Sequence, residues 1–560
     1  MFKKLRRNSL VLLGILLLAA CGGGGGGGGS SSGGGSSSSS SSGGPTLQTG
    51  YFIDAPVKGL KYSTATQSGE TDNDGAFQYL DGETVSFYVG DVLIGEAAGA
   101  AQISPFTLAG ITTPPQTGVE IKQVINEVYR SRHATPIQVA TNIAVFLQTL
   151  DEDGDLANGI QIPAQMHTLA TGVSIDFEQD WWGFPRDFPF RKLIAAGRSA
   201  GLWGGSRAIR SPAYALDALY AGLGITPEIY ALSVREDDSN ADGTADSRTT
   251  YTYDANGNLT MYEYDSNADG TVDWRYTYTY DANGNRTMYE MDSNADGTVD
   301  SRETYIYDAN GNQTLYEYDG NADGTIDWRM MYTYDANGNQ TMYEGDSNAD
   351  GTVDSRETYT YDANGNQTLY EYDGNADGTV DSRRNYSYDA DGNRTLYERD
   401  DNADGTVDWR ATYAYDANGN RTMYEEDSNA DGTVDLRHTF TYDANGNQTM
   451  YERDDNADGT VDSRETYTYD ANGNQTMRER DSNADGTVDW RRTYSYDANG
   501  NRTLYERDDN ADGTVDWRET YTYDANGNQT MTETDDYADG TVDFLQLYTY
   551  QLVGGWMYYF

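Results

Sequence analysis

The strongest constraint on this chain is a unit of 27 residues that repeats with little change from residue 238 to the C-terminus. One phrase, Asp-Ala-Asn-Gly-Asn with few variations, starts at Asp254 and recurs every 27 residues to Asp524, in eleven copies. A second phrase, Asp-x-Asn-Ala-Asp-Gly-Thr-x-Asp, starts at Asp238 and recurs at the same step to Asp535, in twelve copies. A fixed period of this length indicates supersecondary units that each pack on their neighbours. Such arrays favour a structural or binding protein over an enzyme.

Each unit reads as a β-hairpin. Asn283-Gly284 predicts a tight turn in which both residues take a positive φ. Alternation in the strand at residues 274–280 places the tyrosines on one face and the threonines on the other, while in the strand at residues 286–290 Thr287 and Tyr289 share a face and Met288 lies opposite. Stacked units would align ladders of Tyr, Thr and Met or Leu. We therefore expect a mainly β protein, whose long hairpin array forms a curled or spiral, solenoid-like sheet.

The second phrase has the ligand spacing of a calcium loop. In Asp292 to Glu303, oxygen-bearing side chains occupy positions 1, 3, 5, 9 and 12, and Gly297 occupies position 6. The flanks are strand-like, and most copies lack Glu at position 12, so the loop resembles those of calcium-dependent repeats more than a complete EF-hand. The alternative is that Asp, Asn and Gly simply make a good hairpin turn. Three aspartates and an asparagine at alternate positions are more than a turn needs, which favours several bound calcium ions.

The predicted calcium ligands come from six of these turns. They are Asp238, Asn240, Asp242, Asp246, Asp265, Asn267, Asp269, Asp273, Asp292, Asn294, Asp296, Asp300, Glu303, Asp346, Asn348, Asp350, Asp354, Glu357, Asp454, Asn456, Asp458, Asp462, Glu465, Asp508, Asn510, Asp512, Asp516 and Glu519. In a meander, the acidic turns would lie along one edge about 10 Å apart, close enough to repel one another at physiological salt.

The overall charge limits the partners. With 90 acidic and 38 basic side chains, the formal net charge is −52, which excludes binding to nucleic acid by charge and favours divalent cations. The chain has one cysteine, Cys21, so it forms no intramolecular disulfide.

The N-terminus resembles that of bacterial lipoproteins. Lys3, Lys4, Arg6 and Arg7 precede the short apolar run 10–18, and Leu18-Ala19-Ala20-Cys21 matches a lipobox. The resemblance implies cleavage before Cys21, its acylation and anchoring in a membrane, with the outer membrane of the cell envelope expected because Gly22 follows. The alternative is an ordinary signal peptide with a chance cysteine.

The remaining chain divides by composition. Residues 22–44 are only Gly and Ser and predict a flexible tether. The proposed parts are a signal peptide (1–20), the lipidated cysteine and tether (21–44), a small β-sandwich (45–105), a mostly helical segment (106–225), the repeat array (226–550) and a C-terminal capping hairpin strand (551–560).

The segment between tether and array has two kinds of pattern. Asp54-Ala55-Pro56-Val57-Lys58-Gly59-Leu60 with Thr71-Asp72-Asn73-Asp74-Gly75-Ala76-Phe77 resembles the β-sandwich of carboxypeptidase-regulatory-like domains. Thr135-Pro136 and Ser211-Pro212 predict helix starts. Trp181, Trp182 and Trp203 fill a helical core or, alternatively, form a surface patch for glycan stacking.

The repeated Tyr-Asp-x-x-Gly-Asn phrase is similar to the YD or Rhs repeats of bacterial surface and toxin-shell proteins, over about residues 226–560. The resemblance implies hairpins in a large spiral sheet. Three functions follow: a lipid-anchored, calcium-stiffened stalk or adhesive surface for an unknown protein or glycan ligand; a Rhs-like shell or carrier; and, least favoured, an enzyme in residues 45–225. With His133, His167 and His438 as its only histidines and no nucleophile motif, we expect no enzyme.

Overall fold

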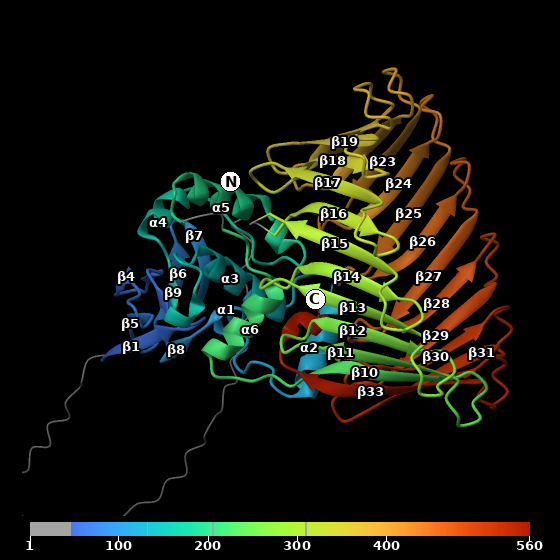
Figure 1. The fold of residues 1–560 in the computed structure, drawn as a ribbon, viewed down its shortest axis with the longest axis horizontal. Helices are drawn as coiled ribbons and strands as arrows, with labels where there is room; N and C mark the ends of the chain where they lie inside the picture. The colour runs from blue at the N-terminus through green and yellow to red at the C-terminus, as the bar shows by residue number, and fades with distance from the viewer. Residues whose placement is uncertain (1–45, 132, 204–206, 309–310, 560) are drawn as a thin grey trace, which may run out of the picture. The chain divides into compact units, whose positions relative to one another are not determined.

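A computed structural model describes residues 46–131, 133–203, 207–308 and 311–559. Two regions follow each other in the part that it describes, and Figure 1 shows both: a mixed head, which we define as residues 46–228, and an all-β barrel built from the repeats. Cys21, the signal peptide and the tether lie outside the described residues. None of the helices in the described part of the chain is long and apolar enough to cross a membrane.

The head contains three small sheets and six α-helices within the described residues. The sheets have the strand orders β5-β1-β8, β4-β3-β6-β7 and β2-β9. The strands are β1 (Leu47–Phe52), β2 (Val57–Lys58), β3 (Lys61–Ser63), β4 (Ser68–Glu70), β5 (Ala76–Leu80), β6 (Thr84–Val89), β7 (Val92–Ala98), β8 (Gln102–Ile103) and β9 (Ile160–Gln161). The helices are α1 (Pro105–Leu108), α2 (Gly118–Arg130), α3 (Pro136–Leu150), α4 (Ala164–Leu169), α5 (Phe188–Ser199) and α6 (Pro212–Gly222), with 3-10 turns η1 (Leu156–Asn158) and η2 (Phe184–Arg186).

A single hydrophobic core runs through the head. Phe52 and Phe77 both contact Phe87 in T-shaped, edge-to-face geometry, and α3 is buried along nearly its whole length. Helices α3 and α6 begin at Pro136 and Pro212, directly after the predicted cap residues. Because β2 from the first segment pairs with β9 from the helical one, the two segments share one core.

The repeats form a meander of 24 antiparallel strands. Each strand pairs with its neighbours in sequence. Their bounds are β10 (Ile229–Asp238), β11 (Ser247–Tyr253), β12 (Leu259–Asp265), β13 (Trp274–Tyr280), β14 (Arg286–Asp292), β15 (Ser301–Tyr307), β16 (Gln313–Asp319), β17 (Trp328–Tyr334), β18 (Gln340–Asp346), β19 (Ser355–Tyr361), β20 (Gln367–Asp373), β21 (Ser382–Tyr388), β22 (Arg394–Asp400), β23 (Trp409–Tyr415), β24 (Arg421–Asp427), β25 (Leu436–Tyr442), β26 (Gln448–Asp454), β27 (Ser463–Tyr469), β28 (Gln475–Asp481), β29 (Trp490–Tyr496), β30 (Arg502–Asp508), β31 (Trp517–Tyr523), β32 (Gln529–Asp535) and β33 (Phe544–Val553).

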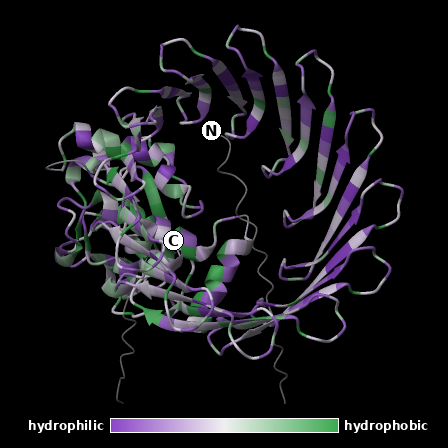
Figure 2. Ribbon diagram, turned by 45° about the vertical axis from the view of Figure 1, so that its right-hand side comes forward, coloured by the Kyte–Doolittle hydropathy of each residue, from purple (hydrophilic) through white to green (hydrophobic). Residues whose placement is uncertain are grey.

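The sheet closes on itself. Strand β10 pairs with β33 from Ile229 opposite Val553 to Asp238 opposite Leu545, which joins the first strand to the last and makes a barrel. The ring of strands is visible in Figure 2. The expected spiral or solenoid is therefore wrong, while the mainly β hairpin array is confirmed. Each of the eleven hairpins closed by an Asp-x-x-Gly-Asn loop carries a register shift, for example between Thr279 and Tyr280, and such bulges bend and twist a sheet in a constant direction.

The C-terminal residues differ from the expected capping hairpin. Strand β33 continues to Val553, and the chain then forms the 3-10 turn η3 (Trp556–Tyr559). Trp556 is fully buried, its ring lies 5.6 Å from that of Tyr220 in α6, and its backbone N–H donates to Asp217. A hairpin is impossible here because β10 already occupies the free edge of β33. The end of the chain instead packs against the head.

The Asn-Gly turns also differ in detail from the expectation. Gly284 has a φ of +79°, but Asn283 does not take a positive φ. The Asp281 carboxylate accepts hydrogen bonds from the backbone N–H groups of Asn283 and Asn285, and Asp281 N–H donates to the Asn285 carbonyl. These bonds close a five-residue loop over residues 281–285, so one left-handed glycine is enough.

Tyrosine hydroxyls link each hairpin to the one before it. The Tyr280 hydroxyl donates to the Leu259 carbonyl at 2.8 Å, and the Tyr334 hydroxyl donates to the Gln313 carbonyl at 2.7 Å. The same bond, always 21 residues back, recurs in eleven copies from Tyr253 to Tyr523. The tyrosine before each Asp-x-x-Gly-Asn loop is thus needed for its hydroxyl as well as its ring.

A second ladder, of ion pairs, lies on the opposite face of the sheet. Arg275 in β13 pairs with Glu263 in β12 at 2.6 Å, and Arg356 in β19 pairs with Glu344 in β18 at 2.7 Å. These side chains are part exposed, with the two arginines 30% and 33% accessible. Each exposed pair contributes about 0.2–1 kcal/mol, so the ladder favours correct register more than it adds stability.

Candidate functional site: the two rims of the barrel

The barrel has two chemically different rims. We call the edge formed by the twelve Asp-x-Asn-Ala-Asp-Gly turns, from residue 238 to residue 543, the acidic rim. The edge formed by the eleven Asp-x-x-Gly-Asn loops, from residue 254 to residue 528, is the YD rim. Because strands are consecutive in the sheet, all turns of one kind lie at the same end of the barrel. The predicted placement of the acidic turns along one edge is therefore confirmed.

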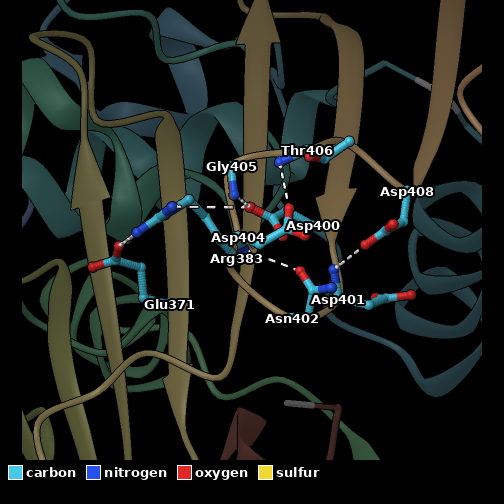
Figure 3. Close-up of polar contacts among 9 residues, drawn as sticks. All are labelled: Glu371, Arg383, Asp400, Asp401, Asn402, Asp404, Gly405, Thr406 and Asp408. Atoms are coloured by element: carbon cyan, nitrogen blue, oxygen red, sulfur yellow. Dashed lines mark hydrogen bonds and ion pairs between the residues drawn. The ribbon is translucent and has the colours of Figure 1, made fainter.

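Each acidic turn is built by its own side chains, as Figure 3 shows for residues 400–408. The Asp400 carboxylate accepts from the backbone N–H groups of Asp404 at 3.0 Å and Gly405 at 2.9 Å. The Asn402 Oδ1 accepts from Asp404 N–H, and the Asp404 Oδ1 accepts from Thr406 N–H at 2.8 Å. These bonds wrap the backbone around the carboxylates at positions 1, 3 and 5.

The fourth position of each turn carries backbone strain. Ala403 has a φ of +53°, and the equivalent alanine in all twelve turns lies between +48° and +53°. The left-handed region costs a residue with a Cβ about 1–2 kcal/mol. The side-chain bonds of the turn, four in the copy at residues 400–408, must therefore outweigh this strain.

The first aspartate of the turn is buried beside an arginine. Asp400 is 3% exposed, and its Oδ2 lies 4.0 Å from an NH1 of Arg383, which also pairs with Glu371 at 2.8 Å. Asp454 and Arg437 repeat this 4.0 Å approach. The ion-pair ladder thus ends at the base of the acidic rim, where the arginine balances part of the buried negative charge.

The predicted calcium ligands are brought together only in part. Positions 1, 3 and 5 hold the same loop-forming bonds in all six predicted turns, so their oxygens surround one short stretch of backbone. Position 9 is turned elsewhere: Asp300 accepts from the backbone N–H of Ser293, at position 2, at 2.7 Å. Within residues 46–131, 133–203, 207–308 and 311–559, no three His, Cys, Asp or Glu side chains form a group that could hold a metal ion.

The glutamates at position 12 lie away from the turns. Glu303 is in β15, opposite Tyr289 and Tyr318, and accepts a hydrogen bond from the Tyr305 hydroxyl. Glu357, Glu465 and Glu519 accept from the tyrosine two residues later in the same way. A strand after the loop directs the side chain at position 12 to the tyrosine face of the sheet. A helix after the loop would instead turn that side chain back toward the loop. The complete calcium loop is therefore not formed.

The twelfth turn shows what the fold itself requires. Tyr537 replaces the asparagine at position 3, yet Asp535 still accepts from Gly540 N–H and Asp539 still accepts from Thr541 N–H. Ala538 keeps its positive φ of 48°. Turn formation thus depends on positions 1 and 5, and the asparagine is dispensable for it.

The acidic rim is a ring of fixed negative charge. Every turn contains aspartates at positions 1, 5 and 9, and four of the twelve turns have a further aspartate at position 2. The Thr406 N–H lowers the pKa of Asp404, and the Ser293 side chain and backbone N–H lower the pKa of Asp300. Lowered pKa values at these exposed positions keep the carboxylates ionised at neutral pH. The rim can therefore attract cations without losing its own fold.

The head occupies part of the YD rim. Gln123 and Asn126 of α2 donate to Asn499 and Asn501, both at 2.9 Å, and Arg191 of α5 donates to the Asn337 carbonyl at 3.1 Å. These contacts could not be predicted from the sequence, because the helix residues that make them are ordinary polar positions.

Other parts of this rim are more open. A Cβ added at Gly392, Gly419 or Gly446 would meet only the asparagine of the preceding loop within 4 Å, among the described residues. The head therefore contacts loops at both ends of the repeat array and leaves loops in the middle accessible.

Comparisons with known proteins give weak matches. No family model and no curated protein matches the chain. Among solved structures, the crystal structure of TcdB2-TccC3-TEV is 16% identical, with a TM-score of 0.32 over 55% of this chain and 16% of that one. The Photorhabdus luminescens Tc holotoxin pore is 15% identical, with a TM-score of 0.27 over 60% of this chain and 19% of that one.

A porin-like protein from Bacteroides uniformis is 12% identical, with a TM-score of 0.19 over 57% of this chain and 96% of that one. The chain thus spans less than a fifth of the Tc proteins that it matches. Because these TM-scores are low, the description of the fold depends on the strand pairing given above and not on these matches.

Proposed function

We propose that this protein is a lipid-anchored β-shell of the bacterial cell envelope, which encloses or carries a cargo inside its barrel. The observation that carries the proposal is the pairing of β10 with β33, which closes the repeat array. An open stalk needs no such pairing, because its two end strands would stay free. The closure therefore favours the shell over the adhesive stalk that the periodicity alone suggested.

The number of strands supports an interior space. Twenty-four strands at about 4.8 Å give a circumference of roughly 115 Å, and thus a diameter of about 37 Å between backbones. Barrels of eight strands are filled by their own side chains, whereas those of 16 or more leave room inside. The half-buried side chains of one sheet face, either the tyrosines or the arginine–glutamate ladder, would line this space with polar groups.

The anchor part of the proposal depends on Cys21. Its lipobox lies outside the described residues, and the Gly/Ser stretch 22–44 would hold the shell away from the lipid. In a Cys21→Ser variant we expect the protein to move from the membrane fraction to the soluble envelope fraction. An unchanged membrane fraction would contradict lipidation at this residue.

A disulfide trap tests the closure. Glu236 and Leu547 are register partners on β10 and β33, and opposite residues of an antiparallel pair are close enough for a disulfide. In a Cys21→Ser background, Glu236→Cys with Leu547→Cys should oxidise to an intramolecular disulfide. Glu236→Cys with Leu552→Cys, which are not partners, is the matched control. If the partner pair formed only intermolecular disulfides, the array would be open.

An accessibility experiment tests the enclosed space. Tyr278 and Thr279 are adjacent and point to opposite faces of β13. Single Tyr278→Cys and Thr279→Cys variants, again without Cys21, would be treated with a small maleimide and with one carrying a long polymer. A shell predicts that both react with the small reagent and only one with the large one. Equal reaction of both with the large reagent would exclude an enclosed lumen.

Calcium stiffening is a second candidate function. It is favoured by the preformed oxygens at positions 1, 3 and 5 of the acidic turns and by the repulsion among neighbouring turns. Calcium chloride should raise the Tm of the full chain more than sodium chloride at equal ionic strength, and chelator should reverse the change. Equal effects of the two salts would mean that the acidic rim binds no calcium specifically and that salt only screens its negative charge.

A further inference from the structure

A cavity of about 590 Å³ lies between the head and the YD rim. Four of its lining residues are arginines from the head: Arg186 of η2, Arg191 and Arg198 of α5, and Arg210 just before α6. In a chain with 38 basic residues and a net charge of −52, this concentration of guanidinium groups around one cavity is exceptional. The four arginines are unlike those of the barrel, which follow the regular ion-pair ladder.

These arginines are poorly balanced by carboxylates. Among the described residues, no aspartate or glutamate oxygen is recorded within 4.0 Å of any of the four. Asp308 and Asp335 act on Arg191 from farther away, and Asp308 also acts on Arg198. The cavity therefore keeps net positive charge on its head side.

The carboxylates near Arg210 compensate it weakly. They are Asp54 and Asp217, and burial raises the pKa of Asp54 to about 8 and that of Asp217 to about 7. At neutral pH both groups are therefore largely or partly protonated. Most of the positive charge of Arg210 is therefore not compensated by these two carboxyl groups.

Several guanidinium N–H groups have no acceptor. The Nε atoms of Arg198 and Arg210 are buried without a hydrogen-bond partner. Arg191 donates from Nε to the Pro185 carbonyl and from NH1 to the Asn337 carbonyl. Its second terminal nitrogen is left to donate to a ligand. A buried donor without a partner destabilises a fold, so such groups require an explanation. An oxyanion in the cavity would accept from them in the paired geometry that guanidinium groups favour.

The rim side of the cavity offers a different chemistry. Asn285, Asn312 and Asn339 line it, and each donates its Nδ2 to the aspartate of its own loop. Their Oδ1 atoms thus remain acceptors for hydroxyl groups. Trp182, also in the lining, is 55% exposed, so its indole presents a flat apolar face.

We propose that this cavity binds a small acidic sugar, whose carboxylate or sulfate group lies against the arginines and whose hydroxyls lie against the asparagine amides. The charged side matches one acidic group, the amide side matches hydroxyls, and Trp182 matches the C–H face of a sugar ring. A volume of this size is within the usual range for small-molecule sites and exceeds the needs of an inorganic ion. The proposal is independent of the shell function, because it requires only the packing of the head on the YD rim.

Calorimetric titration of the full chain tests the proposal with two matched ligands, glucuronate and glucose, which differ only in the carboxylate. Saturable binding of glucuronate and none of glucose is the expected result. Equal binding of glucose, or no saturable binding of glucuronate, would overturn it. Inorganic sulfate is a third ligand: if it bound as tightly as glucuronate, the sugar ring would have no role and the assignment to a sugar would fail.

Arg186→Gln is the first variant, because no hydrogen bond of its side chain is recorded in the described part of the chain. We expect it to weaken glucuronate binding by about tenfold or more, since a charge-assisted bond is lost. Arg198→Lys, which keeps the charge but removes the fork, should weaken binding as well. The control is Arg507→Gln, whose arginine pairs with the exposed Asp509 at the acidic rim. Unchanged affinity in the first two variants, with native Tm values, would exclude the site.

Discussion

The head and the barrel of this protein are stabilised in different ways. The head has a dry core of Phe, Ile, Leu and Trp side chains, many of them fully buried, whereas the strands of the barrel are mostly half-buried and contain Tyr, Thr, Arg and Glu. Figure 2 shows the same contrast, with apolar residues gathered in the head. The barrel relies on bonds between neighbouring strands that recur in each unit, so any one of them is weak and replaceable.

The largest expected effect is in the head. Phe146 of α3 is fully buried, and its ring lies 5.5 Å from those of Phe177 and Phe190. Phe146→Ala should lower the free energy of unfolding by about 3–5 kcal/mol, because it leaves a cavity. Tyr129→Ala, at a position 73% exposed, is the control. A loss below about 1 kcal/mol, measured by urea unfolding, would mean that the core is not tightly packed.

A smaller effect is expected at the acidic rim. Asp400→Ala removes the acceptor of two backbone N–H groups in one turn and should cost about 1–3 kcal/mol. Asp401→Ala, at the adjacent exposed position, should change little. Hydrogen exchange of the Asp404 and Gly405 amides would report the change locally. Equal exchange in the two variants would show that the buried carboxylate does not hold the turn.

The tyrosine ladder should give a still smaller effect. Tyr334→Phe removes one hydroxyl bond to the Gln313 carbonyl and keeps the ring, so we expect a loss of about 0.5–1.5 kcal/mol. Tyr537→Phe, at a position 77% exposed, is the matched control. Combining Tyr→Phe changes at several distant rungs should give additive losses. A strongly cooperative collapse after a single change would contradict the picture of many replaceable bonds.

The smallest effect should have the opposite sign. Ala403→Gly relieves the left-handed strain and should stabilise the barrel by about 0.5–1 kcal/mol, after the extra backbone entropy of glycine is subtracted. Ala417→Gly, in a YD loop and without a positive φ, should instead destabilise slightly. Thermal unfolding of the two variants side by side would measure the difference. Destabilisation by both would show that the alanine conformation is not strained.

Local patterns in the sequence predicted much of the local structure. The hairpins, the meander order and the strand at residues 274–280 follow from periodicity and turn residues within one unit, whereas the return strand, expected over residues 286–290, extends to Asp292. Glu303 and its equivalents were assigned wrongly to the loop, because a calcium loop flanked by helices directs position 12 inward and a strand does not. The alternation of side chains along the strand decides to which face position 12 points. The spacing of residues in the loop does not carry that information.

Global features could not be predicted in the same way. Ring closure depends on a small bend at each bulge, summed over the hairpins of the ring, and no single residue encodes that angle. The arginines around the cavity are far apart from the Asn-Gly loops in sequence, and only the docking of the head brings them together. Both features arise from tertiary packing, which periodicity does not describe.

The closure of β10 on β33 also constrains how such a chain can change during evolution. Near-identical tandem units are prone to gain or loss by recombination, and an open array would simply lengthen or shorten. In a closed ring, each added or deleted unit brings or removes two strands and changes the circumference by roughly 10 Å. All remaining hairpins must then adjust their bend, and the head must fit a rim of another size. Copy number in this protein is therefore set by geometry, and the allowed sizes form a series of discrete steps.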